Sequence, residues 1–239
     1  MVALIGDFAL RCGGEQVDVT PSSQRLICFL ALRPPHPVRR MFVSGTLWPD
    51  SDEVKASANL RSALWRIPAP GGSAVVCASA THVWLHPDVQ VDLRQVARSA
   101  MDVIDGHVDN AQLVNVAREV CSIDDDVLVG WYDDWVITER ERFRQLRLHA
   151  LDYLGEQLLA EGRYYDALRV GLVAVSAEPL WESGHRLIMR THLAEGNIAE
   201  AIHRYQSYAS LLAAELGARP SSAMEALRSE SFASAAGRR

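Results

Sequence analysis

Apolar residues in the first third of the chain change their spacing along the sequence. Over residues 2–19 they partly alternate with polar residues around a turn at Gly13-Gly14, which predicts a strand pair. After Thr20-Pro21, which is typical of a helix start, they recur at helical spacing instead. The predicted elements are strands over Val2–Arg11 and Gln16–Val19, a helix from Thr20 to the stop at Pro34, helices over Arg39–Leu47 and Val54–Ile67, and a strand hairpin over Ala74–Cys77 and His82–His86.

From Asp92 onward the apolar spacing is helical only, and one segment repeats. Leu159–Leu168 resembles Leu193–Ile202, and Gly162 and Gly196 lie 34 residues apart, which is the tetratricopeptide period. Small residues in such repeats let paired helices approach closely and turn tightly. The sequence predicts an all-α repeat domain with helices over Leu93–Ile104, Gln112–Cys121, Trp131–Glu161, Tyr165–Ala177, Trp181–Ala194 and Ile198–Leu216.

The two parts of the chain also differ in charge. The formal net charge is −6, yet residues 1–92 carry eight basic and eight acidic side chains, whereas residues 93–239 carry 16 and 22. We therefore expect two domains, 1–92 and 93–239. In the first, a helix, a loop, a second helix and a hairpin follow one another as in a winged helix-turn-helix. The predicted fold class is an α+β N-terminal winged helix-turn-helix followed by an all-α tetratricopeptide-like helical repeat domain.

Composition argues against several classes of protein. With 49% hydrophobic and 23% charged residues the chain is globular, and no apolar run approaches the roughly 18 residues of a membrane span. The first residues lack the cationic start and long apolar stretch of a signal peptide. The four cysteines have no zinc-finger spacing and are predicted to be buried thiols of a reducing cytoplasm. We expect a cytoplasmic protein without membrane contact.

The helix predicted over Val54–Ile67 has an apolar face and a cationic face. The cationic face has no acid and offers donors suited to base edges, because arginine pairs with guanine, asparagine with adenine and serine with either. An ordinary solvated face is the alternative, since short basic faces are common. The position of this helix as the second of a pair favours DNA binding in the major groove. The candidate contacts are Lys55, Asn59, Arg61, Ser62, Trp65 and Arg66.

Further candidate DNA contacts flank this helix. The tip of the predicted hairpin offers Thr81 and His82 to phosphate, or it is an ordinary turn. Arg39 and Arg40 at the start of the second predicted helix, and Arg25 on the first, are either phosphate contacts or solvated charges. Arginine supplies 23 of the 24 basic residues, and its planar guanidinium suits both phosphate and base edges.

The loop Trp48–Glu53 is acidic. Asp50, Asp52 and Glu53 would repel phosphate, so the loop is expected to face away from DNA. It has two interpretations that do not exclude each other: its acids cap the N-terminus of the following helix, where the helix dipole favours them, or the loop is a protein-contact surface.

No catalytic or metal site is predicted. His82 and His86 share a strand face, and His185 and His192 share a helix face, but neither pair has a third ligand at suitable spacing. The glycine pairs lack the spacing of a phosphate-binding loop, and no nucleophile–base pair stands out. We expect a protein that is not an enzyme and that holds no metal or cofactor.

A set of motifs resembles one family of transcriptional activators, the Streptomyces antibiotic regulatory proteins (SARPs). Its members join an OmpR-type winged helix to a tetratricopeptide-like bacterial transcriptional activation domain. The resemblance runs from the first strand to about Leu227, and the chain ends after the activation domain, as in the small stand-alone type. The motifs are Trp48-Pro-Asp50, Ala58-Asn-Leu-Arg-Ser-Ala-Leu-Trp-Arg66, Gly130-Trp-Tyr-Asp-Asp-Trp135, Glu139-Arg-Glu-Arg-Phe-Arg-Gln-Leu-Arg-Leu-His149 and Ala194-Glu-Gly-Asn197.

The resemblance implies a cytoplasmic bacterial activator that binds double-stranded DNA on direct repeats near a promoter, as a homodimer. It would recruit RNA polymerase and switch on a biosynthetic gene cluster, such as one for an antibiotic. By position, Val54–Ile67 would be the recognition helix and Ala74–His86 the wing. Trp48, Asp50 and the other acids of the loop, Asp52 and Glu53, would contact the polymerase or its sigma factor.

A second hypothesis keeps the fold and changes the function. The chain would be a tetratricopeptide-type adaptor for protein partners, with a winged helix that no longer binds DNA. The neutral charge balance of residues 1–92 is its main support. Substitution of Arg61 or Arg66 separates the two hypotheses, since only the activator would lose DNA binding.

Overall fold

The computed structural model describes residues 1–123 and 125–236 and divides into two compact units. The first unit contains Met1–Arg98 and Ile123–Phe143, and the second contains Ser99–Ser122 and Arg144–Arg239. The first unit is therefore discontinuous in the sequence. The simpler division into 1–92 and 93–239 stays a prediction.

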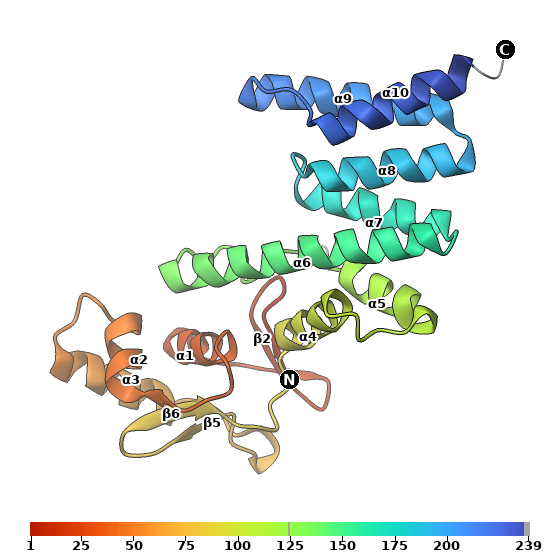
Figure 1. Ribbon diagram of the computed structural model, residues 1–239. Helices are drawn as coiled ribbons and strands as arrows, with labels where there is room; N and C mark the ends of the chain where they lie inside the picture. The colour runs from red at the N-terminus through yellow and green to blue at the C-terminus, as the bar shows by residue number, and fades with distance from the viewer. Residues whose placement is uncertain (124, 237–239) are drawn as a thin grey trace. The chain divides into compact units, whose positions relative to one another are not determined.

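Two small antiparallel sheets and three helices form most of the first unit (Figure 1). Val2 pairs with Leu10 in one sheet and Val38 with Val83 in the other, so the strand orders are β1-β2-β3 and β4-β6-β5. This arrangement confirms the predicted order of strands, helices and hairpin. The elements are β1 (Val2–Ala3), β2 (Ala9–Cys12), β3 (Glu15–Val17), α1 (Pro21–Ala31), β4 (Val38–Arg39), α2 (Arg40–Leu47), α3 (Glu53–Trp65), the 3-10 turn Pro70–Gly72, β5 (Val76–Ala78) and β6 (His82–Leu85).

The N-terminal sheet differs from the prediction of one strand over Val2–Arg11. The chain leaves the sheet after β1 because the Leu4 N–H donates to the Asp92 carboxylate, with nitrogen–oxygen distances of 2.9 and 3.1 Å, instead of to a neighbouring strand. Gly6 then adopts a φ of +80°, a left-handed conformation that suits glycine, and the chain turns into β2. The predicted strand is thus two strands, β1 and β2.

Residues 123–143 complete the hydrophobic core of the first unit. Val127, Leu128 and Val136 are fully buried in the same cluster as Phe29 of α1. A backbone hydrogen bond also connects this segment to the N-terminal strands, because the Leu128 N–H donates to the Leu4 carbonyl at 2.8 Å. Trp135 places its ring edge-on against Phe29, with the ring centroids 5.4 Å apart. A segment distant in sequence therefore closes the core around α1.

The second unit is helical, as predicted from residue 93 onward. Gly162 (φ +72°) and Gly196 (φ +79°) both adopt the left-handed conformation after a helix, so the two repeated glycines make the expected tight turns. Helices α7 to α10 lie next to one another in chain order (Figure 1). The helices that form or enter this unit are α4 (Asp92–Ile104), α5 (Asn110–Cys121), α6 (Asp134–Ala160), α7 (Tyr164–Ala177), α8 (Glu182–Glu195), α9 (Ile198–Leu216) and α10 (Ser222–Ala236).

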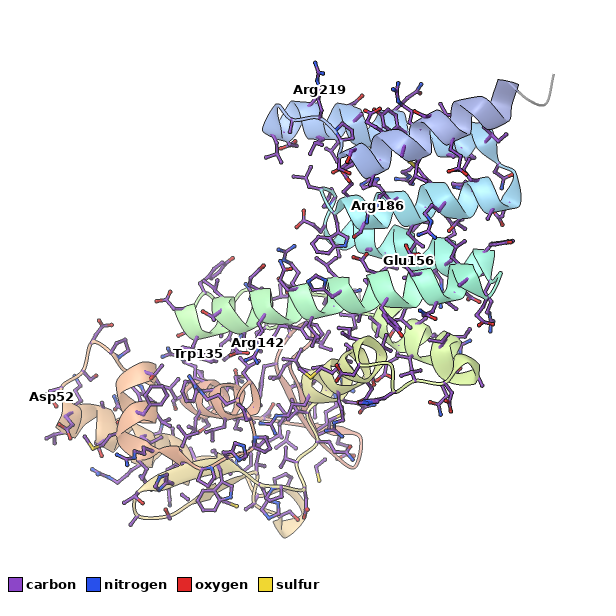
Figure 2. The ribbon with its side chains drawn as sticks, in the orientation of Figure 1. Asp52, Trp135, Arg142, Glu156, Arg186 and Arg219 are labelled. Carbon is purple, nitrogen blue, oxygen red and sulfur yellow. The ribbon has the colours of Figure 1, made fainter. Side chains whose placement is uncertain are left out.

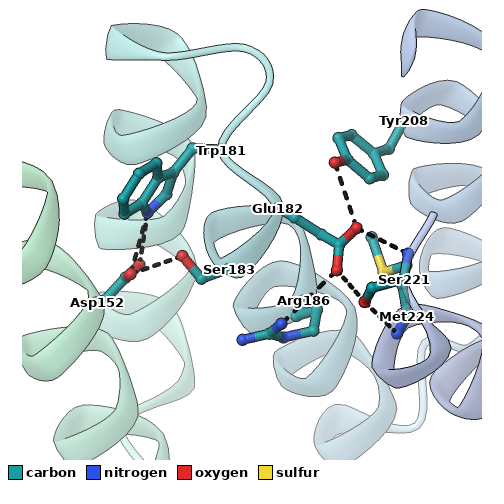
Figure 3. A network of polar contacts seen from close by, with 8 residues as sticks. All are labelled: Asp152, Trp181, Glu182, Ser183, Arg186, Tyr208, Ser221 and Met224. Atoms are coloured by element: carbon teal, nitrogen blue, oxygen red, sulfur yellow. Dashed lines mark hydrogen bonds and ion pairs between the residues drawn. The ribbon is translucent and has the colours of Figure 1, made fainter. Parts of the chain in front are cut away.

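Glycines and a carboxylate hold neighbouring helices of the second unit together. A Cβ atom on Gly155 would lie 2.1 Å from Cδ2 of the buried Leu187, so only glycine lets α6 and α8 approach as they do. Asp152 of α6 accepts hydrogen bonds from the Trp181 indole N–H at 3.0 Å and from the Ser183 hydroxyl at 2.6 Å (Figure 3). Contacts of this kind fix the register of the repeats.

Glu182 forms a second polar centre at the start of α8. Its carboxylate accepts hydrogen bonds from the Ser221 N–H at 3.0 Å and from the Tyr208 hydroxyl at 3.4 Å, and it pairs with Arg186 (Figure 3). Burial, together with the nearby negative charge of Glu182, raises the pKa of Tyr208 to about 12. The network joins α8, α9 and the start of α10.

The four cysteines are free thiols with unequal burial. Cys28 and Cys121 are buried, and burial raises the pKa of both thiols. The prediction of four buried thiols is wrong for Cys12, which is exposed where β2 meets the Gly13-Gly14 turn, and for Cys77, which is half-buried on the outer strand β5. Within residues 1–123 and 125–236, no helix is long and apolar enough to cross a membrane.

His185 is buried in the second unit with one ring nitrogen unpartnered. Its Nε2 lies 2.9 Å from the Pro179 carbonyl oxygen, and its ring centroid is 4.4 Å from that of Tyr208. The buried Nδ1 has no hydrogen-bond partner among the described residues, so a proton added there would have no acceptor. Burial is the main cause that lowers the pKa of His185, and the charge of Arg204 acts in the same direction. The hydrogen bond to the Pro179 carbonyl and the charge of Glu182 oppose this shift.

We therefore expect acid to destabilise the second unit through His185. Below a pH of about 6.5 the unfolded chain binds this proton more readily than the folded chain, so the free energy of unfolding falls. Urea titrations of the wild type and of His185→Gln, above and below that pH, measure the effect, and the variant should lose less stability on acidification. His203→Gln, at an exposed position, is the control. Equal acid sensitivity of His185→Gln and the wild type would contradict the prediction.

Candidate nucleic-acid interface

Helix α3 begins at a capped N-terminus. Asp52 has extended backbone angles, and its carboxylate accepts a hydrogen bond from the Lys55 N–H at 2.8 Å, which satisfies one of the free N–H groups of the first turn. Glu53 adds a second acid at this positive end of the helix dipole. The predicted capping by the acidic loop is confirmed, and Figure 2 shows Asp52 at the edge of the first unit.

One side of α3 is buried in the first unit. Ala56, Leu60 and Ala63 are at most 2% exposed, which confirms that the helix has a buried apolar face. The Ser23 hydroxyl on α1 donates to the Ala63 carbonyl at 2.8 Å, in the buried contact between the two helices. The helix ends at Trp65 instead of Ile67, with Arg66 as its C-cap. The orientation of α3 about its axis is therefore fixed by α1.

The opposite side of α3 faces solvent and carries the candidate DNA contacts. Trp65 is 86% exposed, so its ring is available for contact with a ligand. The guanidinium of Arg61 makes one long hydrogen bond, 3.3 Å, to the Ser57 hydroxyl. Asn59 is half-buried, and the remaining predicted contacts, Lys55, Arg61, Ser62 and Arg66, are exposed.

The structure brings four of the other candidate contacts, Arg39, Arg40, Thr81 and His82, together at the wing. In the pairing of β4 with β6, Arg39 lies opposite His82. The Arg40 N–H donates to the Thr81 carbonyl at 2.9 Å, and its guanidinium donates to the Ser79 carbonyl at 3.0 Å. The Thr81 hydroxyl oxygen lies 2.8 Å from Nδ1 of His82. The start of α2 and the tip of the β5–β6 hairpin thus form one surface with arginine, hydroxyl and imidazole groups.

Arg25 lies outside this surface. Its guanidinium donates to the Leu47 carbonyl at 3.0 Å and forms a short ion pair with Asp133. The half-buried side chain therefore ties α1 to the end of α2 and to the segment that completes the core. No local pattern in the sequence points to Asp133 as its partner, because the two residues lie 108 positions apart.

The residues of the acidic loop have different environments. Trp48 is half-buried and packs against the hydrophobic core, and Asp52 is engaged as the helix cap. Asp50 and Glu53 are exposed, and next to them Val54 is 80% exposed. An exposed pair of acids beside an apolar side chain is suited to contact with another protein.

The chemistry available at this interface is that of binding. It offers guanidinium, amide, hydroxyl and indole groups on a rigid helix and a hairpin, the set that reads phosphates and base edges in duplex DNA. Among residues 1–123 and 125–236, no group of three or more histidine, cysteine or acidic side chains is placed to hold a metal ion.

Comparison with known proteins agrees with this architecture. Residues 87–230, more than half of the chain, match the family model of the bacterial transcriptional activator domain. No curated protein matches the sequence. The fold is similar to that of Mycobacterium tuberculosis EmbR, solved in complex with a low affinity phosphopeptide, with a TM-score of 0.77 and 18% sequence identity. The similarity covers 97% of this chain and 64% of that chain, so this chain spans less than two thirds of the EmbR chain.

The family match and the fold together identify the class of protein. The matched domain supplies the helical repeats, and the preceding residues form the small sheets and the α2–α3 pair of a winged helix. The chain therefore belongs to the bacterial transcriptional activator domain family.

Proposed function

We propose that the chain activates transcription by binding double-stranded DNA with the exposed face of α3 in the major groove. The observation that supports this proposal most is the orientation of the helix: α1 holds the apolar side of α3 inside the unit, and the acid-free side faces solvent. Arg61 and Arg66 would read guanine, and Asn59 would read adenine. Trp65 would contact an apolar group such as a thymine methyl.

The wing would contact the DNA backbone beside α3. Arg39, Thr81 and His82 offer a charge, a hydroxyl and an imidazole to phosphate, and Arg40 holds the wing tip in place through its bond to Ser79. Phosphate contacts of this kind position a protein on the duplex without reading its sequence. In this proposal Arg25 has a structural role and does not contact DNA.

The acidic loop would carry the contact to RNA polymerase or its sigma factor. Asp50 and Glu53 are exposed and free to meet a basic surface, whereas Trp48 and Asp52 shape the loop. The protein would act in the bacterial cytoplasm, as a homodimer on direct repeats near the promoter of a biosynthetic gene cluster. It would act by binding alone, without a catalytic site.

Loss of one guanidinium on α3 tests the DNA interface. Arg61→Gln is expected to weaken binding to the DNA upstream of the neighbouring genes by about 1–3 kcal/mol, the typical loss for one bidentate arginine–guanine contact. Fluorescence anisotropy at two salt concentrations, with scrambled DNA beside the upstream DNA, measures this loss. The preference for the upstream sequence should shrink with it.

Arg142→Gln provides the matched control. Arg142 is exposed on the part of α6 that belongs to the first unit, so this variant loses the same charge away from α3 (Figure 2). It should bind the upstream DNA nearly as the wild type does. If the wild type shows no preference for the upstream DNA, or Arg61→Gln keeps it in full, the adaptor hypothesis is the better one.

A further inference from the structure

Arg33 follows the end of α1 and is held between two aromatic rings. Its guanidinium carbon lies 4.2 Å from the centroid of Phe29 and 5.0 Å from that of Phe42. Phe29 is fully buried, whereas Phe42 on α2 is 50% exposed. Arg94 fixes the backbone below, because its guanidinium donates to the Arg33 carbonyl at 2.5 Å and to the Leu30 carbonyl at 2.9 Å. Arg33 is thus held in place both at its backbone carbonyl and at its guanidinium.

In the part of the chain that the structure describes, the polar edge of the Arg33 guanidinium has no protein acceptor. Among residues 1–123 and 125–236, the contacts of its nitrogen-bearing end are the two ring stacks, and no carboxylate or carbonyl accepts from it. Stacking on aromatic faces leaves the in-plane N–H donors of arginine available for a carboxylate. Arg33 is therefore a fixed cation whose hydrogen-bonding edge is open to a ligand.

Arg33 also lines two hollows on the surface of the first unit. One, of about 190 Å³, lies between the end of α1 and the start of α6, with Trp135 and Glu139 in its wall. The other, of about 440 Å³, follows the segment from Arg33 to Phe42 and is lined by Pro34, Pro37, Val38 and Phe42 together with His36 and Arg39. We call the second hollow the Arg33 groove.

We propose that the Arg33 groove is a docking site for an acidic peptide segment of a partner protein. A carboxylate of that segment would pair with the guanidinium of Arg33, and an adjacent apolar side chain would pack against Phe42 and Pro37. The proposal concerns a protein contact and does not depend on the proposed binding of DNA.

Charge and shape together favour this occupant. Among the described residues, the charged side chains that line the groove are Arg33 and Arg39, and no acid lines it. Its walls are otherwise apolar, and apolar side chains make no favourable contact with the charged phosphates of a DNA backbone. Arg33 is also separate from the proposed DNA-binding side of α3. That side lies opposite the contact with α1, whereas Arg33 lines a hollow at the start of α6. An acidic segment with apolar residues complements the groove in both respects.

The test uses the full chain and a short fluorescein-labelled peptide in which aspartate alternates with leucine and phenylalanine. Anisotropy should show saturable, salt-sensitive binding of this peptide, and the same peptide with asparagine for each aspartate should bind far more weakly. Arg33→Gln should lower the affinity for the acidic peptide roughly tenfold, as expected for the loss of a charge-assisted hydrogen bond. Arg33→Lys, which keeps the charge without the planar fork, should fall between the two.

Arg98→Gln is the matched control, because Arg98 is exposed on α4 in the same unit and does not line the groove. It should bind the acidic peptide as the wild type does, and thermal melting should show that all variants are folded. Equal binding by Arg33→Gln and the wild type, or no saturable binding of the acidic peptide, would overturn the proposal. So would a loss of DNA affinity alone in Arg33→Gln, which would make Arg33 a phosphate contact. Self-association that Arg33→Gln abolishes would make a second copy the occupant and overturn the partner segment.

Discussion

A chain that ends at Arg98 is expected not to fold cooperatively, although it contains all the strands and the three helices of the winged helix. The truncation removes Val127, Leu128 and Val136, which are fully buried in the core of the first unit. Burying a side chain of this kind contributes about 1.5–3 kcal/mol. Loss of all three removes about 4.5–9 kcal/mol, which is comparable with the lower half of the roughly 5–15 kcal/mol by which a typical domain is stable.

The truncation would also leave polar groups without partners. Arg25 would lose Asp133, and the Leu4 carbonyl would lose the Leu128 N–H. A half-buried guanidinium without its carboxylate and a backbone carbonyl without a donor each add to the cost. The winged helix in this chain thus depends on residues that follow it by some thirty positions in the sequence, counted from Asp92 to Ile123.

Thermal melting followed by circular dichroism measures this dependence. The chain ending at Arg98 should lack a cooperative transition, and a chain ending at Phe143, which restores the missing segment, should regain one. DNA binding should be lost and regained in the same way if the proposed interface is correct. A cooperative melt of the shorter chain near the temperature of the longer one would show that residues 123–143 are dispensable.

Gly155→Val is expected to destabilise the second unit by about 3 kcal/mol, toward the upper end of the range for overpacked cores. The first added atom, Cβ, would already lie 2.1 Å from Cδ2 of Leu187. Leu187 is 2% exposed and has little room to move aside. The helices α6 and α8 would have to separate, and the hydrogen bonds of Asp152 to Trp181 and Ser183 would lengthen.

Gly45→Val is the matched control for this substitution. Gly45 lies within α2, and a Cβ atom there would meet nothing within 4 Å. Because valine is a somewhat better helix former than glycine, this variant should be as stable as the wild type or slightly more so. Urea denaturation measures both changes, and a Gly155→Val variant as stable as the Gly45→Val variant would contradict the close contact.

Much of the fold follows from local features of the sequence. Helical spacing located α7, α8 and α9 to within one residue at each end, and the repeated Gly162 and Gly196 predicted the turns between helices. The apolar positions of α3, such as Leu60, predicted which side of the helix is buried. Such features are readable because helix periodicity, capping and positive φ depend on neighbours within a few residues.

Pairing across long separations could not be predicted in this way. Spacing alone indicates that a residue is buried and does not identify its partner, so no pattern in the sequence shows that the rings of Phe29 and Trp135 meet. The two-residue strand β4 was not predicted from the sequence, for a related reason. It is defined by its pairing with β6, and two residues carry no period.

The sequence by itself determined most of the element types and their order, the two faces of α3 and the glycine turns of the repeats, whereas β4 and α10 were not predicted. Only the tertiary structure decided that residues 123–143 complete the first unit, that Arg25 is engaged with Asp133, and that Arg33 keeps an open hydrogen-bonding edge. The reason is physical. An amphipathic pattern fixes how a segment divides between core and solvent, whereas the use of each charged group depends on which distant groups the folded chain brings within hydrogen-bond reach.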